Sequence, residues 1–163
     1  MKKQIVKAIG VASLAMLVLA VLTQIGVSAQ ALKGNEQGLI GSWDLEVTLR
    51  DCQDGSVIVI FPAINTYNQG GTTQQTAPPE PFSTFLPGHG VWSHQVGSNY
   101  SGAFRFFKIN PDGSLATKTI VRSAITLGRD NQSYTSTDTA KTLNANGDLL
   151  FRGCSTTTAT RFQ

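Results

Sequence analysis

The segment Gly88–Lys108 constrains the fold more than any other part of this 163-residue chain, because its side chains alternate with a period of two. It consists of two alternating runs separated by Gly97, and it carries both histidines of the chain. A period of two that is rich in aromatic residues and bounded by glycines is typical of paired strands. The segment therefore predicts a hairpin, and aromatic residues on both faces predict a central position in a sheet. The rings on its alternating faces include those of Trp92, His94, Tyr100, Phe104 and Phe106.

Alternating runs and turn signals continue along the rest of the chain, without helical periodicity after its N-terminal segment. Gly38–Leu49 alternates between apolar and polar residues, as a strand with one wet face does. Ser56–Phe61 is apolar on both faces, which predicts a strand covered on both sides. We therefore predict an all-β antiparallel fold of about eight strands. Short turns between sequential hairpins favour a closed up-and-down barrel over a sandwich.

Residues 62–81 interrupt this pattern. The segment is rich in Asn, Gln, Thr and Gly, ends in a proline-rich sequence and lacks sustained periodicity. It therefore predicts a long loop, and loops of this length inside a compact domain are either disordered or functional, for example as a lid. Both interpretations stay open.

The N-terminal segment predicts a signal peptide over residues 1–29. Three lysines by position 7 precede the apolar run Ile9–Leu22, and small residues before Ala29 suit a signal peptidase. Cleavage after Ala31 fits equally well, and an uncleaved membrane anchor is the alternative. Residues 30–163 then form one barrel domain, since roughly 130 residues are typical of a single domain. We expect the protein to be secreted or periplasmic, without stable membrane insertion after cleavage.

The basic character of the chain belongs to this N-terminal segment. The formal charge is +3, and three lysines lie before residue 8. The remaining lysines and arginines equal the acidic residues in number. The sequence shows no cluster of positive charge, so it does not predict a nucleic-acid partner.

The chain has two cysteines, Cys52 and Cys154. In an exported protein, a disulfide bond between them is the default expectation. Neither cysteine belongs to a CxxC motif or has a histidine nearby in the sequence, so free thiols for catalysis or metal binding have weaker support.

The two ends of the barrel sequence together resemble the lipocalin and calycin group. Gly41-Ser42-Trp43 matches the Gly-x-Trp of the first strand in that group, and Arg161 lies in the final strand, with Arg152 as the other candidate. The resemblance implies that Trp43 lies at the closed end of the barrel with the late arginine packed across it. It also implies a structural role for that pair, and it leaves the ligand undecided.

Polar chemistry in the sequence is sparse. His89 and His94 have an odd spacing that puts them on opposite faces of a regular strand, and no Asp, Glu or Cys accompanies them, so we expect no metal site. A Gly-x-Ser-x-Gly motif is also absent. Asp138 lies among hydroxyl residues in a strand that is polar on both faces. It belongs either to an exposed edge strand of threonines or to a polar interior beside Tyr134, Ser136 and Arg122.

We therefore expect an exported, non-catalytic binding protein for a small, largely apolar molecule, without a cofactor. Two alternatives stay open: a barrel-type cyclase or isomerase that uses His94, Tyr100 or Asp138, and an envelope or interaction protein with a solid core. The oligomeric state stays open too. The candidate ligand-binding residues are Trp92, His94, Tyr100, Phe104, Phe106, Tyr134 and Asp138.

Overall fold

A computed structural model describes residues 38–78 and 84–162 of the chain. The predicted signal peptide and its cleavage site lie outside these residues. Within them the secondary structure consists of strands, and no helix of this part is long and apolar enough to cross a membrane. The strands are β1 (Gly41–Arg50), β2 (Val57–Tyr67), β3 (Thr72–Thr76), β4 (Thr84–Phe85), β5 (Gly88–His94), β6 (Asn99–Ile109), β7 (Leu115–Leu127), β8 (Ser133–Asn144) and β9 (Leu149–Arg161).

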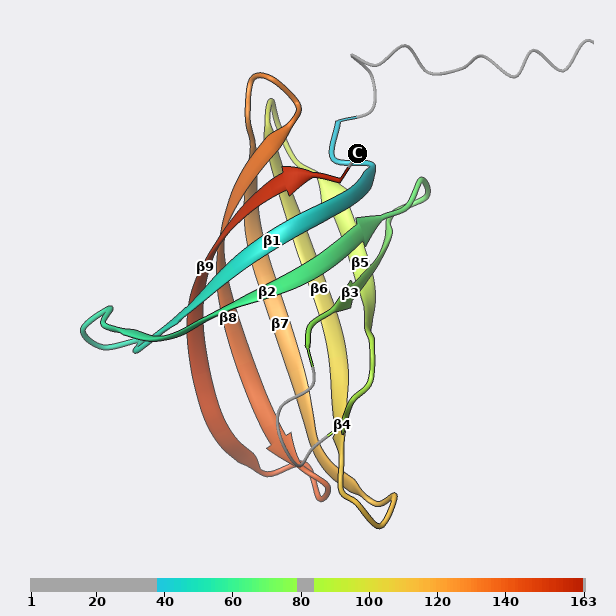
Figure 1. The fold of residues 1–163 in the computed structure, drawn as a ribbon, viewed down its shortest axis with the longest axis vertical. Helices are drawn as coiled ribbons and strands as arrows, with labels where there is room; N and C mark the ends of the chain where they lie inside the picture. Colours follow the sequence, from blue (N-terminus) through green and yellow to red (C-terminus); the bar gives the residue numbers. More distant parts are fainter. Residues whose placement is uncertain (1–37, 79–83, 163) are drawn as a thin grey trace, which may run out of the picture. The chain divides into compact units, whose positions relative to one another are not determined.

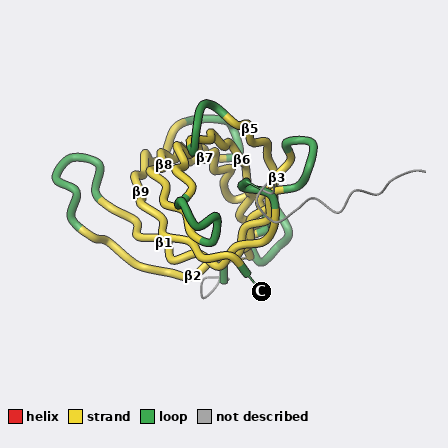
Figure 2. Tube along the Cα trace, turned by 90° about the horizontal axis from the view of Figure 1, so that it is seen from above, coloured by secondary structure: helices red, strands yellow, loops and turns green. Residues whose placement is uncertain are grey.

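The strands close into an antiparallel barrel (Figures 1 and 2). The order β1-β2-β3-β5-β6-β7-β8-β9 follows the chain, and β9 pairs back with β1. The short β4 pairs with the end of β6 next to β5, so β4 and β5 act as one interrupted wall strand around Pro87. The predicted all-β, up-and-down barrel of about eight strands is therefore confirmed, and the Gly88–Lys108 segment forms the hairpin β5–β6.

The predicted loop over residues 62–81 is wrong for most of its length. Residues 62–67 continue β2, residues 72–76 form β3, and residues 79–83 lie outside the described part. The sequence pattern did not indicate β3 because its sequence is TTQQT, in which the inward Thr73 is no more apolar than its neighbours. Pro62 also suggested a loop, but it lies where β2 has no partner on its outer edge, since β3 pairs only from Ile64.

The apolar core fills the end of the barrel where β1 begins. Leu39 and Trp43 are fully buried there, and Ile125 of β7 is almost fully buried. Alternation turns the odd-numbered residues of β1 inward, while Asp44 and Glu46 face solvent, as expected for a half-buried strand. The full core cluster is Leu39, Trp43, Leu45, Val47, Ala63, Tyr67, Ile125, Leu127, Tyr134 and Ala159.

The hairpin between β1 and β2 leaves the barrel wall as an arm (Figure 1). β1 stays paired with β9 up to its last residue, Arg50, which pairs with Cys154, and residues 51–56 beyond it form the turn of the arm. The four residues Val57–Ile60 at the start of β2 are 45–54 % exposed. The expectation of a strand covered on both sides is therefore wrong here, because the apolar run belongs to the arm and not to the barrel wall.

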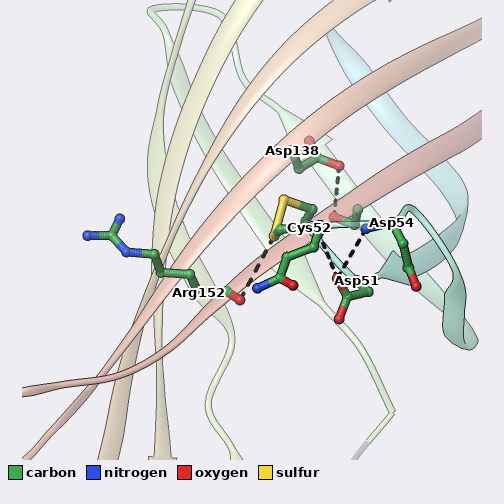
Figure 3. The surroundings of a disulfide bond; sticks show 8 residues. Asp51, Cys52, Asp54, Asp138 and Arg152 are labelled. Carbon is green, nitrogen blue, oxygen red and sulfur yellow. Dashed lines mark hydrogen bonds between the residues drawn. A yellow bond between two sulfur atoms is a disulfide. The ribbon is translucent and has the colours of Figure 1, made fainter.

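A disulfide bond joins the base of this arm to the barrel (Figure 3). Cys52 in the β1–β2 turn is bonded to Cys154 of β9, as predicted. The turn itself is organised by Asp51, whose carboxylate accepts hydrogen bonds from the backbone N–H groups of Gln53 and Asp54. The bond thus joins the arm to the last strand at the point where the arm leaves the barrel.

Candidate functional site

The closed end of the barrel is sealed by Arg161 and Trp43. The guanidinium carbon lies 4.2 Å from the ring centroid of Trp43, and the indole N–H donates to the carbonyl oxygen of Leu39 at 2.9 Å. The guanidinium also donates hydrogen bonds to the carbonyl oxygens of Gly38, Ile40 and Asn131. Burial lowers the pKa of Arg161 from its usual value. The pair therefore forms a floor that holds the start of β1 to the end of β9.

Next to this floor lies a group of aromatic rings from four strands. Tyr134 contacts Trp43 edge-on at 4.9 Å between centroids, and Tyr67 contacts Tyr134 at 6.1 Å. Trp92 contacts both Tyr67 and Tyr100 at 5.9 Å. Edge-on contacts of this kind bring the positive ring edge to a negative ring face and stabilise the group beyond its burial.

Two tyrosine hydroxyls of this group point at each other. The hydroxyl of Tyr67 donates to that of Tyr134 over 3.5 Å. Burial raises the pKa of Tyr67 to about 12, and the negative charge of Asp138 adds to this effect. Burial also raises the pKa of Tyr134, and Asp138 contributes there as well. The interior around these hydroxyls therefore disfavours a further negative charge.

A polar belt surrounds the middle of the barrel. The carboxylate of Asp138 is 8 % exposed and accepts hydrogen bonds from Ser136 at 2.9 Å, Thr157 at 3.0 Å and Ser155 at 3.2 Å. Across the barrel, Thr73 donates to the side-chain oxygen of Asn65 at 2.8 Å. The side chains around Asp138 meet because inward positions of neighbouring strands are paired. Ser155 of β9, for example, lies directly opposite Asp138 of β8.

The other half of the barrel is lined by phenylalanines. Phe104 and Phe106 of β6 stack at 6.4 Å between centroids, and Phe85 of β4 meets Phe106 edge-on at 5.5 Å. These rings, and the inward Val121 that is paired with Phe104, are only half-buried although the wall strands surround them. An apolar inner surface thus stays accessible to solvent in this half, unlike the tightly buried closed end.

By alternation, all seven predicted ligand-binding residues lie on the inward faces of their strands, and six of them are buried or half-buried. Trp92, Tyr100 and Tyr134 belong to the aromatic group, Asp138 to the polar belt, and Phe104 and Phe106 to the accessible half. His94 is exposed at the rim, where its imidazole bonds the carbonyl of Gly97 at 2.7 Å. It lies on the inward side of β5 by alternation but at the very end of the strand.

The expected neighbourhood of Asp138 is right for two residues and wrong for one. Tyr134 and Ser136 share its face of β8. Arg122 pairs with Thr139, an outward position, and is exposed. The alternative of an exposed edge strand is also wrong, because β8 pairs on both sides, with β7 and β9. Thr135, Thr137 and Thr139 lie on its outer face, whereas Thr142 faces inward and hydrogen-bonds Thr119.

Sequence reasoning missed Tyr67, Asn65 and Thr73, because all three fall in the segment predicted as a loop. It also missed Ser155 and Thr157, which donate to Asp138. The signal that could have found these two is the alternation of β9, in which Ser155, Thr157 and Ala159 share one face with small or hydroxyl side chains. Polar alternation carries little weight in sequence reasoning because hydrophobic periodicity is the usual guide.

A wide groove of about 740 Å³ lies on the outside of the barrel, over β2, β1, β9, β8 and β7. Outward residues such as Asp44, Glu46, Thr135 and Thr158 line it. It is open to solvent, and its carboxylates Asp44 and Glu46 are exposed, although the register pairs them with Thr160 and Thr158 of β9. In the part of the chain that the structure describes, no three His, Cys, Asp or Glu residues come together as a metal site.

The chain was compared with known proteins on the basis of both its sequence and its fold. No protein-family model, no curated protein and no solved structure matches it. The fold and the interior of the barrel are therefore the basis for assigning a function.

Proposed function

We propose that this protein is an exported carrier or receptor that binds a small, largely apolar molecule inside a calycin-like barrel. The observation that carries the proposal is the half-buried state of Phe104 and Phe106 on the inner face of β6. Large apolar side chains on the inside of a barrel are normally packed against each other when the interior is solid. Here the rings keep accessible surface, which an apolar ligand would cover.

The gradient of burial along the barrel supports the same assignment. The closed end is packed around Trp43 and sealed by Arg161, whereas the Phe85–Phe106 end is accessible. Ligand sites of this kind lie in the mouths of barrels and combine apolar walls with a few polar groups. The polar belt at Asp138 lies between the two ends and supplies such groups.

The geometry favours binding over catalysis. His94 is bonded to Gly97 at the rim, whereas Asp138 is held in the interior by hydroxyl groups. A barrel enzyme of the cyclase or isomerase type would need an acid and a base that face one bound substrate. No hydrogen bond or ring contact joins these two candidates in the described residues, so catalysis has less support than binding.

Binding of the neutral apolar dye N-phenyl-1-naphthylamine to the disulfide-bonded protein tests the proposal. We expect dye fluorescence to rise on binding, and Phe106→Ala to weaken binding about tenfold, since about 1.4 kcal/mol of apolar burial is lost. Phe107→Ala is the matched control, because Phe107 is the next residue on β6, is equally half-buried and points outward. Absence of dye binding, or equal effects of both substitutions, would contradict the proposal.

A further inference from the structure

The interior carboxylate of Asp138 has surroundings that the apolar-binding proposal does not explain. Every hydrogen bond to it within the described residues comes from an uncharged hydroxyl, of Ser136, Ser155 or Thr157. A buried carboxylate is costly unless a positive charge or several hydrogen bonds compensate it. The hydroxyls compensate it in part, and in residues 38–78 and 84–162 no cationic side chain forms an ion pair with it.

The cationic side chains of the barrel interior lie elsewhere. Arg161 lies over Trp43 at the closed end, and its N–H groups donate hydrogen bonds to backbone carbonyl oxygens. Lys108 lies over the ring of Phe85 at the other end, 5.3 Å from its centroid. Lys108 pairs with Thr117 and Asp138 with Ser123 on the same strand, β7. Along β7, the partner of Lys108 and the partner of Asp138 are therefore six residues apart, which corresponds to about 20 Å of strand.

The hydrogen bonds also leave one position of the carboxylate open. Oδ2 receives the hydroxyls of Ser155 and Thr157, and Ser136 reaches both oxygens but donates a single proton. An ionised carboxylate offers about four acceptor positions. Among the described residues, Oδ1 thus has Ser136 as its one donor, and a donor from a ligand can complete it.

The groups near Asp138 are suited to a cation. Tyr67 and Tyr134 lie close enough for the charge of Asp138 to raise the pKa of both hydroxyls. Aromatic faces attract ammonium groups, and a second negative group would be repelled by Asp138. Beyond Asp138 towards the accessible half lie Val121 and Phe104, which are apolar and half-buried.

We propose that the barrel binds a protonated amine with an apolar body, its ammonium group donating to Asp138 and its body lying along Phe104 and Phe106. This inference rests on the proposed function and specifies the chemical class of its ligand. A charge-assisted hydrogen bond from the ammonium group to Asp138 would fill Oδ1 and neutralise the buried charge.

A matched ligand series tests the inference by isothermal titration calorimetry at pH 7. The ligands are decylamine, decanol and decanoic acid, so that chain length is constant and only the head group changes. The amine and the acid are kept below their critical micelle concentrations, and decanol is kept below its solubility limit. We expect decylamine to bind the wild-type protein at least about tenfold more tightly than decanol, and decanoic acid to bind most weakly. Asp138→Asn should remove the preference for the amine, so that decylamine and decanol bind this variant with affinities within about twofold of each other.

Asp44→Asn is the matched control, because Asp44 is an exposed carboxylate on the outer face of β1 and its loss should not change the preference. If the amine and the alcohol bind the wild type equally, the inference is wrong and the apolar-binding function stands. If none of the three ligands binds, the proposed function is wrong as well. The wild-type series decides between these outcomes even if Asp138→Asn does not fold.

Discussion

Tyr67 and Tyr134 show how the barrel controls single ionisable groups. Both side chains are buried, their hydroxyls bond each other at 3.5 Å, and Asp138 lies nearby. Burial disfavours the charged phenolate, and a neighbouring carboxylate disfavours it further. The pKa of Tyr67 is therefore about 12, compared with 10.0 for an ordinary tyrosine. The folded protein keeps this hydroxyl neutral and available as a hydrogen-bond donor.

Alkaline pH should therefore destabilise the protein. A raised folded pKa contributes stability that is fully present below the unfolded value of about 10 and is lost as pH rises through about 12. For Tyr67 the free energy of unfolding should fall by on the order of 2–3 kcal/mol across this window. Urea unfolding at pH 8 to 12 measures the slope, which Tyr67→Phe should reduce. Equal slopes for the variant and the wild type would contradict the assignment to Tyr67.

At the scale of elements, Gly90 and Gly102 of the hairpin β5–β6 differ in what surrounds them. Both lie on inward faces, Gly90 opposite Phe104 and Gly102 opposite Trp92. A Cβ at Gly90 would overlap the carbonyl oxygen of Ala103 and lie 2.5 Å from the Cα of Phe104. A Cβ at Gly102 would make ordinary contacts, with Ile125 Cδ1 at 3.6 Å. Close approach of the two strands thus requires glycine at position 90 only.

Gly90→Ala should lower the free energy of unfolding by more than about 2 kcal/mol, because backbone atoms of β6 must move. Gly102→Ala should change it by less than about 1 kcal/mol, because the methyl group fits and the unfolded chain loses freedom. Thermal unfolding monitored by circular dichroism compares the two variants. A Gly90→Ala protein as stable as Gly102→Ala would show that β5 and β6 are further apart than described.

At the scale of the whole molecule, closure of the barrel joins the two ends of the domain. β1 pairs with β9, Arg161 lies over Trp43, and Cys52 is bonded to Cys154 across a sequence separation of 102 residues. The disulfide lies next to the interior hydrogen bonds in the sequence, because Cys154 precedes Ser155 and the hydroxyl of Ser155 donates to Asp138. Figure 3 shows Asp138 in the surroundings of the disulfide. The covalent link and the candidate binding site therefore share one strand.

Removal of the disulfide should destabilise the protein without changing its fold. Closing a loop of about 100 residues limits the unfolded chain and contributes at most about 4.7 kcal/mol in the chain-entropy treatment. The double variant Cys52→Ser, Cys154→Ser should therefore unfold at lower urea concentration, with an unchanged far-ultraviolet spectrum before unfolding. The reduced wild type is the control and should match the double variant. Unchanged stability in both would contradict a role in joining the ends of the barrel.

The lipocalin and calycin resemblance predicted that Trp43 packs against a late arginine, Arg161 or Arg152. The sequence by itself determined the period-two strands, the all-β class and the pairing of the two cysteines. These features follow from local alternation, turn residues and residue counts, which depend little on distant parts of the chain. The expected ligand-binding residues also proved to lie on the inward faces of their strands, although alternation alone does not say which face of a strand points inward.

Only the tertiary structure decided the rest. The polar strand β3 was hidden because its faces do not differ in hydrophobicity, and the apolar Val57–Ile60 proved to be exposed because it belongs to the projecting arm. The register of β7 against β8 placed Arg122 outside and brought Ser123 beside Asp138. Register depends on the pairing of strands, and a shift of one residue exchanges the inside for the outside of the barrel. The environment of Asp138, assembled from β8 and β9, could therefore not be derived from either strand alone.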